Sequence, residues 1–424
     1  MLAEIIPATA LLLLAAYALM ILFSHGATLL NLRHMRMHGT LVPTELGRII
    51  PSQTLSRIQA YESDKARFGI GASLFDAVVT VVFIFGGVLA WYDGWIRSFD
   101  LPFISGGVLF VFLLYSAGEV LDIPLALYRT FRIEARHGFN TMTLRLWILD
   151  FVKSTLISLA LLAVVSAGVL WLMQSSPGYW WFWAWLFLLC FSLFVMYIAP
   201  HIIEPLFNKF EPVKDEQLAG EIAAMCEKAG VHAGKVQKMD ASRRSRHSNA
   251  YFTGIGRVKR IVLFDTLLAQ MTHAEILSVL AHEIGHWKKR HIFKSIVLMQ
   301  IFSFAGLSAA YVLVQGDTLG QLFGVEVQTF MGKCILLSFV GGIVMFPFRP
   351  LMLAWSRHNE READRFSFAL TGDNESMATS LIKLSRENLS NLYPHPLYVA
   401  LHYSHPPLVE RVRAIRSFRK DHLL

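Results

Sequence analysis

Seven long apolar stretches constrain this chain more than any other feature of its sequence. A helix needs about 20 mostly apolar residues to cross the hydrocarbon core of a bilayer. The first stretch has neither a basic region before it nor a small-residue cleavage site, so we expect a retained anchor rather than a signal peptide. The seven predicted spans are Ile5–Ser24, Phe68–Trp91, Phe103–Ile123, Phe151–Met173, Trp180–Ile198, Ile292–Val314 and Lys333–Trp355. The sequence therefore predicts a polytopic, mainly α-helical membrane protein.

Basic residues alternate between the loops and orient these spans. The loop after the second span carries only Arg97, and the loops at 175–178 and 315–331 carry none. The loops after the first and third spans hold Arg33, Arg36, Arg48, Arg57, Lys65 and Arg67, and then Arg129, Arg132, Arg136 and Arg145. Because basic loops stay on the cytoplasmic side, we expect the N-terminus outside and the segments after spans one, three, five and seven in the cytoplasm.

The composition agrees with a membrane protein and argues against a nucleic-acid partner. Only 17% of the 424 residues are charged, against roughly a quarter in soluble domains. In so apolar a chain, the net charge of +8 indicates basic loops beside a lipid bilayer rather than a nucleic-acid surface. The three cysteines are far apart and form no CxxC pair, which excludes a disulfide framework or a thiolate metal site.

A few polar and proline residues interrupt the apolar spans. Asp76 and Glu119 lie deep within predicted spans, where ionisable groups face the protein interior or a water-filled cavity. We therefore expect an internal polar cavity. Pro347 and Pro350 are expected to distort the last span.

The stretch from 199 to 291 has the pattern of a small α+β fold. Glu216–Ala229 reads as a helix ended by Gly230, and the Thr272–Glu275 capping box predicts another helix from about His273. Three alternating, β-branched segments read as short strands, namely KVQKMD (235–240), NAYFTGIG (249–256) and KRIVLFDTLL (259–268).

The segment HEIGH, 282–286, predicts a metal site. His282 and His286 are four apart, so both imidazoles lie on one face of a helix, where one zinc ion can bind them, and Glu283 can take a proton from zinc-bound water. The alternative is a pair of surface histidines beside a glutamate. Gly285 inside the helix costs about 1 kcal/mol against alanine, which indicates close packing against the backbone there.

A third zinc ligand has to come from the same side of the membrane. The chain returns there at SRHNEREAD, 356–364, where Glu360 and Asp364 share a helical face and Glu362 points elsewhere. We assign Glu360 as the ligand and Asp364 as the acceptor that orients a ligand histidine. By itself this segment would read as an exposed helix of mixed charge.

These features divide the chain into four regions. Residues 1–198 hold five spans, 199–291 a cytoplasmic metalloprotease segment, 292–355 the last two spans, and 356–424 a cytoplasmic tail that completes the zinc site. The predicted fold is seven transmembrane helices around an internal cavity, with a cytoplasmic α+β portion of zincin-like type.

Six segments in this order resemble the type I CAAX prenyl proteases, which are integral-membrane zinc metalloproteases with seven spans. The segments are ALYRTFRIEARHGFN (126–140), EPLFNKFEPV (204–213), RSRHSNAYFTGIGRVKRIVLFDTLL (244–268), LAHEIGHWKKRH (280–291), SRHNEREAD (356–364) and YSHPPLVERV (403–412). Each segment alone is a modest match, whereas all six in order are specific.

The resemblance implies roles for individual residues. It implies one zinc ion per chain, bound by His282, His286 and Glu360, with Glu283 as the general base. It also implies that Asn249 lies on an edge strand to which substrate adds as a further strand.

In the tail, His405 and Arg411 match positions that reach the site and can steady the oxyanion of a tetrahedral intermediate. Without the resemblance they would read as a turn histidine and a solvated arginine. The chamber enclosed by the family's helices suits Asp76 and Glu119.

The resemblance further implies cleavage near the C-terminus of peptide or protein tails, including prenylated CAAX tails. A compact chain that ends in RKDHLL, without a KDEL-type signal, favours the bacterial inner membrane, with the endoplasmic reticulum left open. Two alternatives stay open: a quality-control metalloprotease with no prenyl requirement, and a transporter or receptor with a structural zinc. An intramembrane-cleaving protease fits less well, because WKKRH follows HEIGH directly.

Overall fold

The computed structural model describes residues 7–47, 49–253 and 258–419. Within them, seven helices are long and apolar enough to cross a membrane, as predicted. They are α1 (Ala8–His38), α2 (Ser52–Phe85), the helical run Phe103–Glu134 that begins with α4 (Phe103–Tyr128), α5 (Leu144–Ser175), the run Trp180–Phe207 that begins with α6 (Trp180–Ile198), α11 (His291–Val314), and the run Phe330–Thr371 that begins with α13 (Phe330–Met345). Ile5, where the first span was predicted to begin, and Arg48 lie outside the described residues.

Two of these helices continue through π-helical turns at the end predicted to be cytoplasmic. The turn η2 (Arg129–Glu134) extends α4, and η3 (Ala199–Ile203) with the short helix α7 (Glu204–Phe207) extends α6. Single π-helical turns occur frequently at functional sites. Within η2, the Glu134 carboxylate accepts a hydrogen bond from the Tyr61 hydroxyl on α2 at 2.9 Å, which ties the extension of α4 to α2.

The helix of the second span ends earlier than predicted, although it begins at Ser52, before the predicted start at Phe68. Helix α2 ends at Phe85, and a separate helix α3 (Val88–Arg97) begins after Gly86 and Gly87. Gly87 has φ 82°, in the left-handed region that glycine adopts without steric cost. The prediction of a continuous span to Trp91 was therefore wrong, because the Gly-Gly pair ends the helix.

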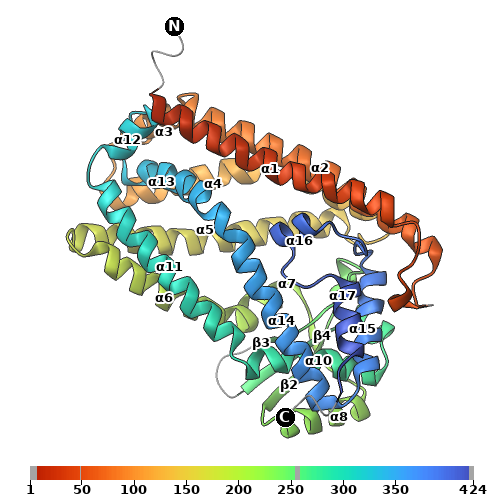
Figure 1. The fold of residues 1–424 in the computed structure, drawn as a ribbon. Helices are drawn as coiled ribbons and strands as arrows, with labels where there is room; N and C mark the ends of the chain where they lie inside the picture. Colours follow the sequence, from red (N-terminus) through yellow and green to blue (C-terminus); the bar gives the residue numbers. More distant parts are fainter. Residues whose placement is uncertain (1–6, 48, 254–257, 420–424) are drawn as a thin grey trace.

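The last span bends where the two prolines were expected to act. Helix α13 passes through the 3₁₀ turn η5 (Phe346–Phe348) into α14 (Arg349–Thr371), with Pro347 in the turn and Pro350 in the first turn of α14. Proline lacks the N–H that a continuous α-helix needs. Beyond the bend, α14 runs as one helix from the membrane helices into the soluble portion (Figure 1).

A cavity of about 470 Å³ lies beside this bend, between α1, α2 and the start of α14. Its polar lining includes Ser24, Ser73, Asp76 and Arg349. Asp76 therefore lines a cavity together with other polar groups, as expected for an ionisable residue at this depth.

The soluble portion contains one four-stranded sheet in the order β1-β2-β4-β3. Strand β2 is parallel to β4, and the other pairs are antiparallel. The strands are β1 (Phe210–Pro212), β2 (His232–Met239), β3 (Ala250–Thr253) and β4 (Val258–Phe264). All three predicted strands are present, but the last was predicted too long, because Asp265 begins α9 (Asp265–Gln270). The end of the predicted NAYFTGIG strand, from Gly254 on, lies outside the described residues.

The sheet packs against two amphipathic helices. Helix α8 (Glu216–Lys228) is followed by Gly230 with φ 62°, and α10 (His273–Lys288) begins with the predicted capping box. The Thr272 hydroxyl accepts the Glu275 amide at 3.4 Å, and the Glu275 carboxylate accepts the Thr272 amide at 2.8 Å. The core between these helices and the sheet includes Ile222, Ile261, Leu263, Ile276 and Leu280.

The C-terminal helices join the soluble portion to the loops of the first and third spans. These helices are α15 (Asn374–Glu387), α16 (Pro396–His402) and α17 (Leu408–Arg416). One buried cluster contains Ile382 and Val412 from this tail, Leu46 and Ile50 from the loop between α1 and α2, and Phe139 from the loop after η2. Further short helices are η1 (Thr44–Leu46), η4 (Ala241–Arg243) and α12 (Thr318–Phe323). The loops after spans one and three and the tail thus gather on one side.

Helices α10 and α14 cross at a glycine. A Cβ added at Gly285 would stand 3.0 Å from the Cα of Ala363 and 3.1 Å from its carbonyl oxygen. The close packing expected from a glycine in this helix is therefore present, and the neighbour is the backbone of α14.

We predict that Gly285→Ala destabilises the protein. Overpacking typically costs about 1–3 kcal/mol, and here the obstructing atoms are backbone that cannot rotate away. This outweighs the gain of about 1 kcal/mol in helix propensity. The melting midpoint in detergent should fall. Gly220→Ala in α8, where a Cβ meets nothing within 4 Å, is the matched control and should raise it. A rise in both variants would contradict the prediction.

Candidate metal centre

Two histidines of α10 face the same point. The Nε2 atoms of His282 and His286 lie 3.1 Å apart. His282 is buried, and the side chain of His286 is 21% exposed. At that separation two unprotonated nitrogens repel each other unless a proton or a cation lies between them, so the pair is arranged to share a positive ligand.

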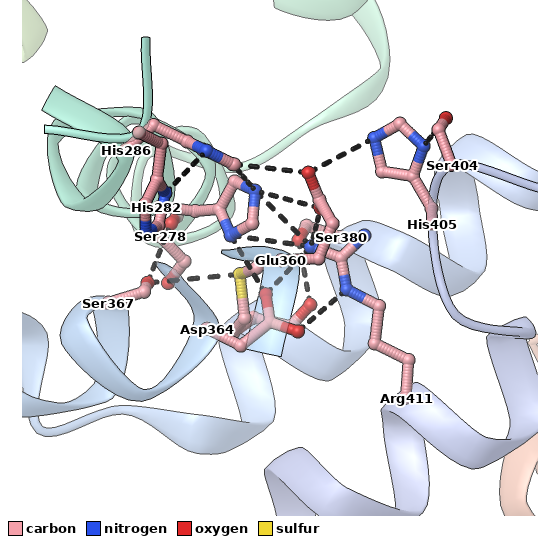
Figure 2. Close-up of polar contacts among 12 residues, drawn as sticks. Ser278, His282, His286, Glu360, Asp364, Ser367, Ser380, Ser404, His405 and Arg411 are labelled. Carbon is pink, nitrogen blue, oxygen red and sulfur yellow. Dashed lines mark hydrogen bonds and ion pairs between the residues drawn. The ribbon is translucent and has the colours of Figure 1, made fainter. Parts of the chain in front are cut away.

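Glu360 of α14 completes this cluster from the other side of the helix crossing (Figure 2). Its Oε1 lies 3.2 Å from His286 Nε2, and its Oε2 lies 3.3 Å from His282 Nε2. Within the described residues, these three side chains form the one group whose potential ligand atoms lie within 4.8 Å of one another.

The donor set and its spacing fit zinc. Two imidazoles and one carboxylate are a catalytic zinc ligand set, which leaves a fourth position open. Bonds of about 2.0–2.1 Å in a tetrahedral site place the donor atoms about 3.3 Å apart, close to the separations found here. Glu360 Oε2 is also buried without a well-aligned hydrogen bond.

Asp364 and Arg411 lie behind His282. The Asp364 carboxylate contacts His282 Nδ1 at 2.8 Å and accepts two hydrogen bonds from Arg411, both 2.7 Å long. Burial lowers the pKa of His282, but Asp364 and Glu360 outweigh it and raise that pKa to about 9 in the metal-free protein. Arg411 is buried, and its Nη2 lies 3.3 Å from Glu360 Oε2, so the tail does reach the cluster.

Glu283 follows His282 on α10 and is half-buried. Burial raises the pKa of its carboxyl above the usual range, although the neighbouring His282 and His286 act in the opposite direction. A carboxyl group with a raised pKa is better matched to proton transfer near neutral pH.

His405 approaches the cluster from the loop after α16. Its exposed side chain places Nε2 3.4 Å from Glu360 Oε1, and its Nδ1 contacts the Ser404 hydroxyl at 2.9 Å. Arg357, one turn before Glu360, donates to the carbonyl of Val399 at 3.1 Å and to that of Tyr403 at 2.8 Å. Arg357 thus ties the end of α16 and the start of the His405 loop to α14.

Asn249 lies at the edge of the sheet, not on α10 or α14. It is exposed, directly before the edge strand β3, and its side-chain oxygen accepts the Ala250 amide at 2.8 Å. Its own carbonyl accepts the Phe264 amide at 3.2 Å, which continues the pairing of β3 with β4.

Two residues beside the cluster, His291 and Glu362, were not among the predicted site residues. His291, the first residue of α11, contacts His286 Nδ1 through its own Nδ1 at 3.0 Å. Its Nε2 contacts Glu362 Oε2 at 3.0 Å. The available signal was the third histidine of HEIGHWKKRH, five positions after His286.

Two family profiles match nearly the whole chain. The CAAX prenyl protease N-terminal domain, with five membrane helices, matches residues 31–209, and peptidase family M48 matches residues 212–419.

Individual relatives agree with these profiles. CAAX prenyl protease 1 homologues from Arabidopsis thaliana and Homo sapiens are 34% and 31% identical, covering 92% and 93% of this chain and 93% of each relative. The crystal structure of S. mikatae Ste24p superposes with a TM-score of 0.88 at 30% identity, covering 96% of this chain and 99% of that one. The chain therefore belongs to the type I CAAX prenyl protease family, and it is a membrane-embedded metalloendopeptidase of peptidase family M48.

Proposed function

We propose that this metalloendopeptidase uses one zinc ion, held by His282, His286 and Glu360, to cleave near the C-terminus of protein tails, prenylated CAAX tails among them. The observation that carries the proposal is the convergence of three ligand atoms within 4.8 Å where α10 crosses α14. The curated relatives named CAAX prenyl protease 1 support this class of substrate.

The chemistry divides between the metal and the chain. When bound, zinc polarises the scissile carbonyl and makes water a better nucleophile at neutral pH. Glu283 accepts the proton of the attacking water and passes it to the leaving amine, a role that its raised pKa favours. Asp364 accepts the Nδ1 proton of His282, which leaves the lone pair of Nε2 directed at the metal position.

Substrate would bind between β3 and the tail. A peptide can add to the free edge of β3 as a further antiparallel strand, with Asn249 at the start of that edge. His405 can donate a hydrogen bond to the oxyanion, because its imidazole already lies 3.4 Å from a metal ligand. Arg411 supplies positive charge at the same place, although its two hydrogen bonds to Asp364 also make it part of the support of His282.

We place this site on the cytoplasmic side. The basic loops after spans one and three pack with the tail that carries Arg411. The positive-inside rule assigns such loops to the cytoplasm.

We predict that Glu283→Gln abolishes cleavage while zinc is retained. Glutamine keeps the size of the side chain but cannot accept a proton, and loss of a general base costs roughly 10²–10⁴ in rate. The measurement is cleavage of a farnesylated CAAX peptide in detergent, together with the zinc content. Glu227→Gln on the exposed face of α8 is the matched control. Undiminished activity of Glu283→Gln would overturn the role of this residue.

A second prediction concerns the lipid group. The wild-type enzyme should cleave a farnesylated CAAX peptide at least about tenfold more efficiently, in kcat/KM, than its unprenylated twin, because a buried isoprenoid adds binding energy of about 0.8 kcal/mol per CH₂ group. Equal efficiency on both peptides would instead identify a quality-control protease without a prenyl requirement.

A third prediction tests the position of His405. Arg357→Met should lower kcat/KM about tenfold, because it removes two charge-assisted hydrogen bonds that hold the His405 loop. In a His405→Ala background the same change should have little further effect. Arg361→Met on the same helix, where the arginine contacts the exposed Glu410, is the control. Additive losses in the double variant would show that Arg357 acts independently of His405.

A further inference from the structure

A row of three side chains, His286, His291 and Glu362, extends outward from the metal centre. His286 Nδ1 lies 3.0 Å from His291 Nδ1, and His291 Nε2 lies 3.0 Å from Glu362 Oε2. The side chain of His291 is 3% exposed, so water cannot easily replace either partner. Glu362 is 27% exposed and forms the outer end of the row.

The chain bends sharply to build this row. Arg290, with φ 56°, separates α10 from α11, and His291 follows it directly. On α14, Glu362 stands two residues after Glu360, about 200° around the helix, so it cannot face the same point as Glu360. His291 bridges that gap from α11, because one of its ring nitrogens contacts Glu362 and the other contacts His286 of the metal centre.

The Glu362 carboxylate at the outer end of the row determines which ring nitrogens of His291 and His286 carry a proton. A carboxylate only accepts hydrogen bonds, so His291 Nε2 must carry the proton that it donates to Glu362. In the neutral imidazole, His291 Nδ1 is then an acceptor, and His286 Nδ1 must donate to it. With its proton on Nδ1, His286 has an unprotonated Nε2, and this is the atom that faces His282 and Glu360.

We propose that Glu362, acting through His291, fixes the tautomer and the ring orientation of the zinc ligand His286, and that both are positioning residues for the metal centre. The proposal rests on the zinc site proposed above. Asp364 does the same for His282 by direct contact at 2.8 Å. The two histidines of HEIGH are therefore oriented by two carboxylates of one helix, one directly and one through an intermediary.

The test measures zinc affinity by competition with a chelator, using the full-length protein in detergent. Partners of this kind typically contribute 10–100-fold in metal affinity. His291→Ala and Glu362→Ala should each weaken zinc binding by about that factor. Glu362→Gln should lie between them and the wild type, because its amide oxygen can still accept the His291 proton. The double variant should bind zinc no more weakly than His291→Ala, since the two residues act in series.

His358→Ala is the matched control. Its exposed imidazole lies 4.0 Å from the same Glu362 oxygen but outside the row, so zinc affinity should not change. Far-ultraviolet circular dichroism of the metal-free variants separates lost folding from lost affinity. If His291→Ala does not fold, the more exposed Glu362 variants carry the test.

The outcomes separate this proposal from the one on which it rests. A wild-type protein that binds no zinc would overturn the zinc site itself. Stoichiometric zinc in the wild type, with unchanged zinc affinity in folded His291→Ala and Glu362→Ala, would overturn the positioning role of His291 and Glu362 but not the zinc site. Losses that add in the double variant would also overturn that role, because they would mean that Glu362 does not act through His291.

Discussion

The metal centre depends on the close crossing of α10 and α14 at Gly285. A side chain at that position would meet the backbone of Ala363 at about 3 Å, so the two helices approach as closely as their main chains allow. Glu360 lies three residues before Ala363, and His282 and His286 flank Gly285. The crossing therefore brings a carboxylate to two imidazoles from a segment 74 positions farther along the chain than His286. Between them the chain passes through α11 and α13, so these two helices precede the return of the chain to the cluster at Glu360.

Buried charge explains why the C-terminal tail belongs to the site. Glu360 and Asp364 are both buried on α14, and two unpaired buried carboxylates would be strongly destabilising. Arg411 of α17 binds Asp364 through two hydrogen bonds and lies 3.3 Å from Glu360. With zinc absent, protonated His282 offsets further negative charge, in keeping with its raised pKa. The tail is thus held against α14, because Arg411 supplies positive charge that offsets the buried carboxylates of Glu360 and Asp364.

The features predicted correctly from the sequence are those that depend on residues close together in the chain. The apolar lengths gave seven spans, the Thr272–Glu275 capping box gave the start of α10, and the four-residue spacings grouped His282 with His286 and Glu360 with Asp364. Errors arose where a short-range signal competed with hydrophobicity. The apolar run to Trp91 concealed the Gly86–Gly87 break, and the strand pattern through Leu268 concealed the helix that starts at Asp265.

The residues that could not be predicted from the sequence are those that contact each other only because the fold brings separate helices together. Glu362 was placed away from the site, correctly for its own helical face, but the turn at Arg290 brings His291 to it from α11. No spacing in the sequence predicts the contact between His291 and Glu362. The same holds for Arg357, whose partners are carbonyl groups of another helix, and a carbonyl group carries no side-chain signature. The roles assigned to Asn249, His405 and Arg411 come from the family resemblance, and their placement leaves those roles as proposals.

The position of the site at the end of two membrane helices follows from the same construction. Helix α10 leads through one left-handed residue into α11, and α14 continues from α13 through the bend at Pro347. Each side of the metal centre is thus the extension of a different membrane span. His291 is both the first residue of α11 and the contact between His286 and Glu362, so the start of this apolar helix lies beside the cluster. Helices α11 and α13 are therefore each continuous, through a short turn, with a helix that carries residues of the His282–His286–Glu360 cluster.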